Sequence, residues 1–190
     1  YNTVGVSGYT NTACMTPTAQ VPDTQLFLMC MQTEVSSPTL IAAMNFQPTA
    51  SPIPSGYLKD DGSLYSAARG YGWTLNLGGQ TRDRNLNPDQ RLDTLVATSH
   101  DGAGTLATWN YNLPNGAYLI SLASGDPGYA QGPHRVEVEG IVVVNNIPTT
   151  ANTYVTITDF PVVVSDGQLS VKLGGTAGNS MLNYLEIRSQ

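Results

Sequence analysis

The chain has 190 residues, only 12% of them charged, and a formal net charge of −6. This length fits one domain of ordinary size with a short appendage, and it excludes a second enzyme-sized domain. The acidic balance argues against nucleic acid as a partner, and the longest apolar run, Leu26 to Met31, is far too short to span a bilayer.

The first 42 residues differ from the rest, and we expect residues 1–42 to form an N-terminal extension to a domain at 43–190. The extension is nearly uncharged, and its apolar run Leu26 to Met31 is typical of a strand buried on both faces. We therefore predict that residues 25–34 form a strand docked on a sheet, either the chain's own or that of a neighbour.

Cys14 and Cys30, the only cysteines, both lie in this extension. The chain starts at Tyr1 without Met and without a basic-then-apolar leader, which predicts a processed, secreted protein. In that compartment a disulfide between the two cysteines is expected, and it would contribute on the order of 3 kcal/mol by closing a loop of about 15 residues. The alternative is a pair of reduced, buried thiols.

Charge is concentrated between residues 69 and 95, which hold four of the eight basic residues of the chain. The arginines of this stretch are interleaved with aspartates and aromatic residues: Arg69, Arg82, Arg84 and Arg91 with Asp83, Asp89, Asp93, Tyr71 and Trp73. Such a mixture is typical of a polar loop network or of a site for an oxygen-rich ligand.

The second half of the chain alternates apolar and polar residues with a period of two, which predicts half-buried antiparallel strands. The alternation is clearest around Ile120, Val136, Val155 and Val171. Turn residues separate these strands at Glu139-Gly140, Asn145-Asn146 and Asp166-Gly167, and the last pair is predicted to close a hairpin. With little helix expected, the fold class is all-β: an antiparallel two-sheet jelly-roll-type β-sandwich with a strand-forming N-terminal extension.

Nine segments in order carry a family resemblance over residues 44–190: MNFQP (44–48), PIPSGYLKDDGSLY (52–65), RGYGW (69–73), TRDRN (81–85), DQRLDTL (89–95), LPNGAYLISLASGDP (113–127), HRVEVEG (134–140), VSDGQLSVKLGG (164–175) and NYLEI (183–187). Together they resemble the secreted bacterial malectin-like, galactose-binding-type carbohydrate-binding β-sandwich domains. The resemblance implies a jelly-roll sandwich without catalytic machinery, and glycan binding at loops on one edge.

Sugar recognition uses an aromatic face for stacking and planar polar groups for hydroxyls. The residues of these types in loop-rich places are Tyr71, Trp73, Arg82, Asp83, Arg84, Asp126 and His134, and we take them as candidate ligand-binding residues. The alternative is structural: an Arg-Asp network would hold a long loop, with Trp73 and Trp109 in the core and His134 as a local hydrogen-bonding group.

We expect neither an enzyme nor a resident cofactor. The chain has no G-x-S-x-G motif, and its two cysteines and two histidines lack the spacing of a zinc site. Calcium is the one cation that oxygen-rich loops such as residues 59–63 or 125–129 could hold.

Two functions from different classes follow. The first is a secreted, non-catalytic protein that binds glycans through edge loops. The second is a self-assembling extracellular structural subunit of a filament or sheath, in which the N-terminal extension adds a strand to a neighbouring copy. The expected partners are thus a glycan or other copies of the chain, and the oligomeric state is open.

Overall fold

The computed structural model describes residues 37–98 and 105–190. The predicted disulfide between Cys14 and Cys30 and the predicted strand at residues 25–34 lie outside this range. The chain divides into two units between Ser37 and Pro38, and the fold described here is that of the second unit, Pro38–Gln190. The first strand of the second unit starts at Leu40, which pairs with Arg188.

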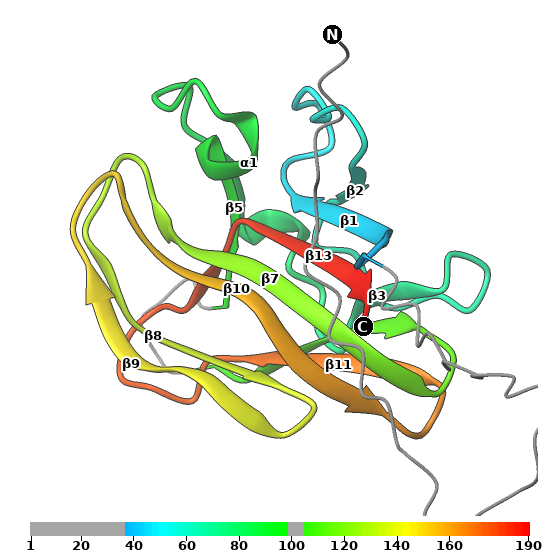
Figure 1. Ribbon diagram of the computed structural model, residues 1–190. Helices are drawn as coiled ribbons and strands as arrows, with labels where there is room; N and C mark the ends of the chain where they lie inside the picture. Colours follow the sequence, from blue (N-terminus) through cyan, green and yellow to red (C-terminus); the bar gives the residue numbers. More distant parts are fainter. Residues whose placement is uncertain (1–36, 99–104) are drawn as a thin grey trace, which may run out of the picture. The chain divides into compact units, whose positions relative to one another are not determined.

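Two five-stranded sheets form the second unit (Figure 1). The first, sheet A, has the order β10 (Thr153–Val164), β7 (Gly116–Asp126), β13 (Tyr184–Ser189), β1 (Leu40–Phe46), β2 (Leu58–Asp60). The second, sheet B, has the order β3 (Tyr71–Trp73), β6 (Ala107–Asn112), β11 (Gln168–Leu173), β8 (Gln131–Val138), β9 (Ile141–Thr149).

Smaller elements complete the described part of the chain. A three-stranded sheet has the order β12 (Met181–Leu182), β5 (Thr94–Ala97), β4 (Thr81–Asp83). The helical elements are a 3-10 turn, η1 (Gly78–Gln80), and one short α-helix, α1 (Gln90–Asp93). Within the described ranges, no helix is long and apolar enough to cross a membrane.

The predicted all-β sandwich is confirmed, and period-2 alternation is its cause. Along β11, for example, Leu169, Val171 and Leu173 are buried while the residues between them are partly exposed. The inward side chains of both sheets form one continuous core. Two details differ from the expectation: β1 and β2 pair in parallel, and the third small sheet was not foreseen.

Two predicted turns, Asp166-Gly167 and Asn145-Asn146, do not have the predicted role between strands. Gly167 does adopt the positive φ expected of a turn, but β10 pairs with β7 in sheet A and β11 pairs with β6 and β8 in sheet B. Asp166-Gly167 therefore joins the two sheets and closes no hairpin. Asn145-Asn146 lies inside β9, where Asn146 takes a positive φ without ending the strand.

A carboxylate sits at the centre of the core. Asp60, 1% exposed, accepts hydrogen bonds from the indole Nε1 atoms of Trp73 at 2.9 Å and Trp109 at 2.8 Å, and from the Gly62 amide. The ring of Phe46 packs edge-on against both tryptophans. Burial raises the pKa of Asp60, and these donors satisfy both of its oxygens.

Candidate functional site

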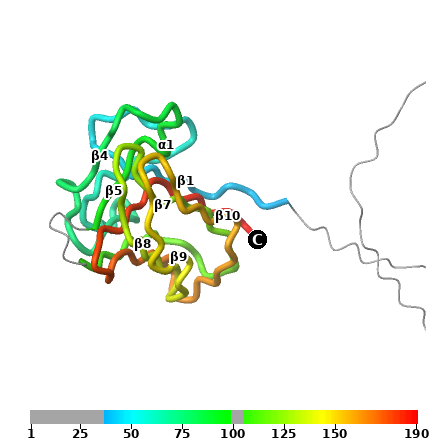
Figure 2. Tube along the Cα trace, turned by 90° about the vertical axis from the view of Figure 1, so that its left-hand side faces the viewer, coloured from blue at the N-terminus to red at the C-terminus, as the bar shows by residue number. Residues whose placement is uncertain are grey.

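Three loops meet at one edge of the sandwich, and we call residues 48–52, 81–87 and 126–131 the loop edge. Figures 1 and 2 show the loop after β1 and the loop before α1 on the same side of the molecule. The third loop joins β7 to β8. The structure thus brings four of the predicted site residues into these loops: Arg82, Asp83, Arg84 and Asp126.

An ion pair ties two of these loops together. The Arg84 guanidinium donates from Nε to Oδ1 of Asp126 at 3.0 Å and from Nη2 to Oδ2 at 2.6 Å. The Asp126 side chain is fully buried, while that of Arg84 is 20% exposed. Asp126 also accepts from the Gly128 amide at 2.8 Å, so its carboxylate is engaged with the protein and positions the 126–131 loop.

A second carboxylate holds the loop that follows Arg84. The buried Asp93 accepts hydrogen bonds from the backbone amides of Asn85, Leu86 and Asn87 at 2.7, 2.7 and 2.6 Å. Burial alone would raise the pKa of Asp93, but hydrogen bonds from these amides outweigh it and lower the pKa. Ionised Asp93 therefore fixes the backbone where Asn85 takes a positive φ.

An open groove of about 500 Å³ lies between the loop after β1 and β4. Its lining combines apolar and polar side chains: Pro48, Ala50, Ser51, Pro52, Thr81, Arg82, Asp83 and Asn85. Arg82 Nη1 donates to the carbonyls of Gly79 and Thr81, and Arg82 has no ion-pair partner among the described residues. The groove therefore offers a guanidinium that forms no ion pair with a carboxylate of the described residues.

Sequence reasoning missed the aromatic residue of the loop edge. Tyr129 is 58% exposed, and the Arg84 guanidinium lies 4.6 Å from its ring centroid. Gly128, next to it, sits close to Leu86 and Arg84, which places this loop beside the one that lines the groove. The signal was present in GDPGYAQGP, where the only aromatic residue of a Gly- and Pro-rich loop is Tyr129.

The two predicted aromatic platforms lie elsewhere. Trp73 is fully buried, so its proposed stacking on a sugar is incompatible with this structure, and its role is packing and hydrogen bonding to Asp60. Tyr71 is partly buried and stacks on Tyr111 at 6.3 Å between ring centroids. Its hydroxyl donates to the Lys59 carbonyl, so Tyr71 completes the core beside Trp109.

His134 is also enclosed, and the candidate role at the ligand does not suit its position. Its Nδ1 accepts from the Met181 amide at 3.2 Å, which leaves the proton on Nε2 for donation to the Thr149 hydroxyl at 2.9 Å. Burial lowers the pKa of His134 to about 4 although nearby Asp126 opposes the shift. The neutral ring is a structural hydrogen-bonding group that links β8, β9 and β12.

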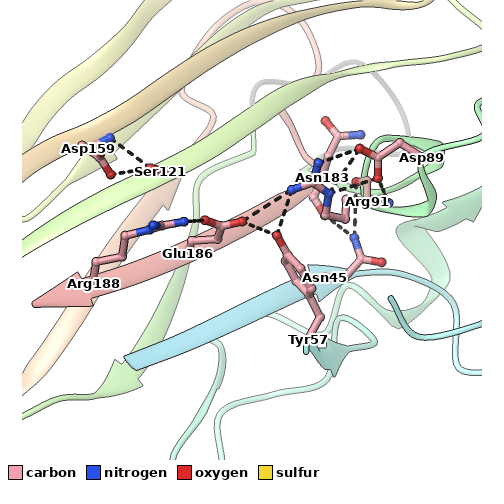
Figure 3. A network of polar contacts seen from close by, with 9 residues as sticks. All are labelled: Asn45, Tyr57, Asp89, Arg91, Ser121, Asp159, Asn183, Glu186 and Arg188. Atoms are coloured by element: carbon pink, nitrogen blue, oxygen red, sulfur yellow. Dashed lines mark hydrogen bonds and ion pairs between the residues drawn. The ribbon is translucent and has the colours of Figure 1, made fainter. Parts of the chain in front are cut away.

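Two further charged residues of the 69–95 stretch, Asp89 and Arg91, belong to a network on sheet A (Figure 3), whereas Arg69 pairs with Asp61 at 4.0 Å. Arg91 pairs with Asp89 at 2.7 Å and with Glu186 at 3.5 Å, and Arg188 pairs with Glu186 at 2.8 Å. The Tyr57 hydroxyl donates to Glu186, and burial raises the pKa of Tyr57 to about 12. The two arginines of this network pair with its two carboxylates. We therefore interpret the network as a structural link that holds α1 against β13.

Neither loop considered for calcium gathers free carboxylates. In the first, Asp60 is bonded to the tryptophans, and Asp61 accepts from Ser63 and Thr49. In the second, Asp126 is paired with Arg84. No group of three or more His, Cys, Asp or Glu side chains suited to a metal ion occurs in residues 37–98 and 105–190.

The chain matches no protein-family model and no curated protein. Its fold is similar to part of the YxiM protein of Bacillus subtilis, with 25% identity, a TM-score of 0.57, and 78% of this chain and 40% of that chain covered. A β-glucuronidase of Bacteroides uniformis matches with 15% identity, a TM-score of 0.53, and 78% and 18% covered.

A family 35 carbohydrate-binding module of Clostridium thermocellum is matched over its whole length and over 82% of this chain, at 17% identity and a TM-score of 0.42. The chain spans two fifths of YxiM and less than a fifth of the glucuronidase. The matches to YxiM and the glucuronidase support the sandwich fold, which recurs there as one part of larger chains.

Proposed function

We propose that this protein is a secreted, non-catalytic glycan-binding module that contacts sugars at the loop edge. The observation that carries the proposal is the open groove with Arg82, Asp83 and Asn85 in its lining, together with the exposed ring of Tyr129 on the neighbouring loop. A tyrosine face suits the apolar side of a pyranose, and arginine, carboxylate and amide groups suit neighbouring hydroxyls. Buried Asp93 and Asp126 hold these groups in place beforehand, which limits the entropy lost on binding.

A binding role fits the groove better than hydrolysis. Glycoside hydrolysis requires two carboxyl groups that face each other across the sugar. Asp83 is the single carboxylate among the residues that line the groove. The recurrence of the sandwich inside larger chains also fits a module that serves a neighbouring domain.

The test is a glycan panel followed by isothermal titration calorimetry on the best ligand. Tyr129→Ala and Arg82→Ala should each weaken binding at least tenfold, because they remove the stacking surface and the unpaired cation. Tyr65→Ala, a partly buried tyrosine bonded to Asn112 outside the loop edge, is the matched control and should bind as the wild type. No glycan bound at millimolar concentration, or release of reducing sugar from a bound glycan, would refute the proposal.

A second function is favoured by one specific observation. Among the described residues, the nine-residue strand β9 pairs with β8 alone, and it exposes Ile141, Val142 and Ile147. An uncharged, apolar sheet edge is a surface on which another strand can add. We therefore also propose a self-assembling extracellular subunit, with sedimentation velocity of the full chain as its test.

A further inference from the structure

The described sandwich has four sheet edges, and three are short or obstructed. The edge strands β2 and β3 have three residues each. The long edge strand β10 carries a register shift between Ile157 and Phe160, with Asp159 at a positive φ of 49° within it, followed by Pro161. A charge, a bulge and a proline are devices by which proteins keep an edge strand from pairing with another chain.

The fourth edge, β9, also contains an irregularity, a positive φ of 55° at Asn146 with register shifts against β8, but it lacks the charge and the mid-strand proline of β10. Its sequence IVVVNNIPT has no charged residue, and its single proline is the next-to-last residue. Ile141 is 50% exposed, Val142 40% and Ile147 41%. The seven residues before Pro148 therefore present three apolar side chains that are 40 to 50% exposed, while Val144 points into the core.

The chain contains a segment that matches this edge in length and character. Residues 25–33, QLFLMCMQT, are nine consecutive residues without charge, in the part of the chain that precedes the sandwich. Added beside β9, such a segment would satisfy main-chain groups of the edge and cover its apolar side chains with its own. No other uncharged run of this hydrophobicity lies outside the described residues.

Chain connectivity favours a segment from another copy. Six residues, 34–39, separate the donor segment's last residue, 33, from the start of β1 at Leu40, and the seven Cα–Cα steps between residues 33 and 40 reach at most ~25 Å. β1 is separated from β10 by β13 and β7, and β9 is the edge of the other sheet. A strand added outside β9 lies four strand spacings of about 4.8 Å and one sheet spacing of about 10 Å from β1, so the path around that side of the sandwich is about 29 Å, longer than the linker reaches.

We propose that β9 is the acceptor edge for residues 25–33 of another copy, so that each chain donates one strand and accepts one. This inference rests on the proposed self-assembly and specifies its contact. A donor segment and an acceptor edge at different places on one chain make a head-to-tail contact, which propagates into a filament unless the rotation closes a ring.

The test uses full-length chains in sedimentation velocity. An acceptor-impaired variant carries Val142→Lys and Ile147→Lys, and a donor-impaired variant carries Phe27→Lys and Met29→Lys. Wild type should form a concentration-dependent series of multimers, and each variant alone should be monomeric, with association weakened at least tenfold. A one-to-one mixture should give heterodimers and nothing larger, because one intact donor meets one intact acceptor. Val163→Lys, on the 68% exposed position of β10, is the matched control and should assemble normally.

Each other outcome overturns a different statement. Multimers that persist in the acceptor-impaired variant overturn β9 as the contact and leave self-assembly standing. Dimers of the donor-impaired variant show that two β9 edges pair with each other, which overturns the proposed occupant. A wild-type chain that is monomeric at all concentrations overturns self-assembly and this inference together. Circular dichroism of every variant, and the single substitutions at 142 and 147, exclude unfolding as the cause.

Discussion

The core centre around Asp60 and the loop edge around Asp126 are built from the same kinds of residue. Each places a buried carboxylate next to nitrogen donors and an aromatic ring. At the core centre the donors are the rings themselves, and both tryptophans are 0% exposed. At the loop edge the donor is Arg84, and the ring of Tyr129 is left 58% exposed. The same residue types therefore build a structural cluster in one region and a candidate binding site in the other. The exposure of the aromatic ring distinguishes the two regions.

The largest expected effect is at the core centre. Trp73→Ala should lower the free energy of unfolding by about 4 kcal/mol, because it opens a cavity and deprives buried Asp60 of one donor. Urea denaturation followed by circular dichroism measures this. A loss below 1 kcal/mol would show that Trp73 is not packed as described and would reopen its role as a platform.

His134 should give the next largest effect, as a dependence of stability on pH. Its pKa is about 4 in the folded protein against an ordinary value of 6.5, so the unfolded chain takes up a proton first as the pH falls. The neutral His134 ring therefore contributes up to about 3 kcal/mol to the free energy of unfolding. This contribution is complete above pH 6.5 and is lost as the pH falls towards 4. In denaturation at several pH values, His134→Gln should lack this part of the acid sensitivity, and equal slopes for both proteins would contradict the assignment.

Asp126→Asn should have an intermediate effect at the loop edge. The amide would turn N–H groups towards Arg84, whose guanidinium is 20% exposed, and we expect a loss of about 2 kcal/mol. Asp89→Asn is the matched control, because the Asp89–Arg91 pair is about one third exposed on both sides and should contribute below about 0.5 kcal/mol. Equal losses for the two variants would mean that the Arg84 pair does not hold the loops.

The smallest stability effect is expected for Tyr129→Ala. An exposed ring with one guanidinium neighbour contributes about 0.5 kcal/mol. Thermal unfolding should hardly change, while glycan affinity drops as described above. A loss of stability comparable to that of Trp73→Ala would place Tyr129 with the core centre and remove the distinction drawn between the two regions.

Local pattern was sufficient for the sandwich and its strands, because alternation and turn chemistry depend on neighbours in sequence. The sheet to which each strand belongs was not predictable in this way. Asp166-Gly167 has the residues of a hairpin turn, yet the strands that it joins enter different sheets, since both can direct their apolar faces into the same core.

The candidate site was predictable only in part for a related reason. Arg84 and Asp126 are 42 residues apart, and no local pattern says that they form one ion pair. Trp73 and Tyr129 are both aromatic residues near glycines, and the sequence analysis chose Trp73, which has the larger ring, as a candidate sugar-stacking residue. Burial, which depends on the whole fold, reverses that choice: Trp73 is enclosed and Tyr129 is exposed.

The hydrogen bonds from Trp73 and Trp109 to Asp60 also decide what intrinsic fluorescence can report. These are the only two tryptophans of the chain, and both indoles share one carboxylate. Tryptophan emission is therefore a single-site signal of core integrity. Sugar bound beside Tyr129 should leave it unchanged, so a spectral shift on adding a glycan would indicate a rearranged core, and a silent titration is compatible with tight binding at the loop edge.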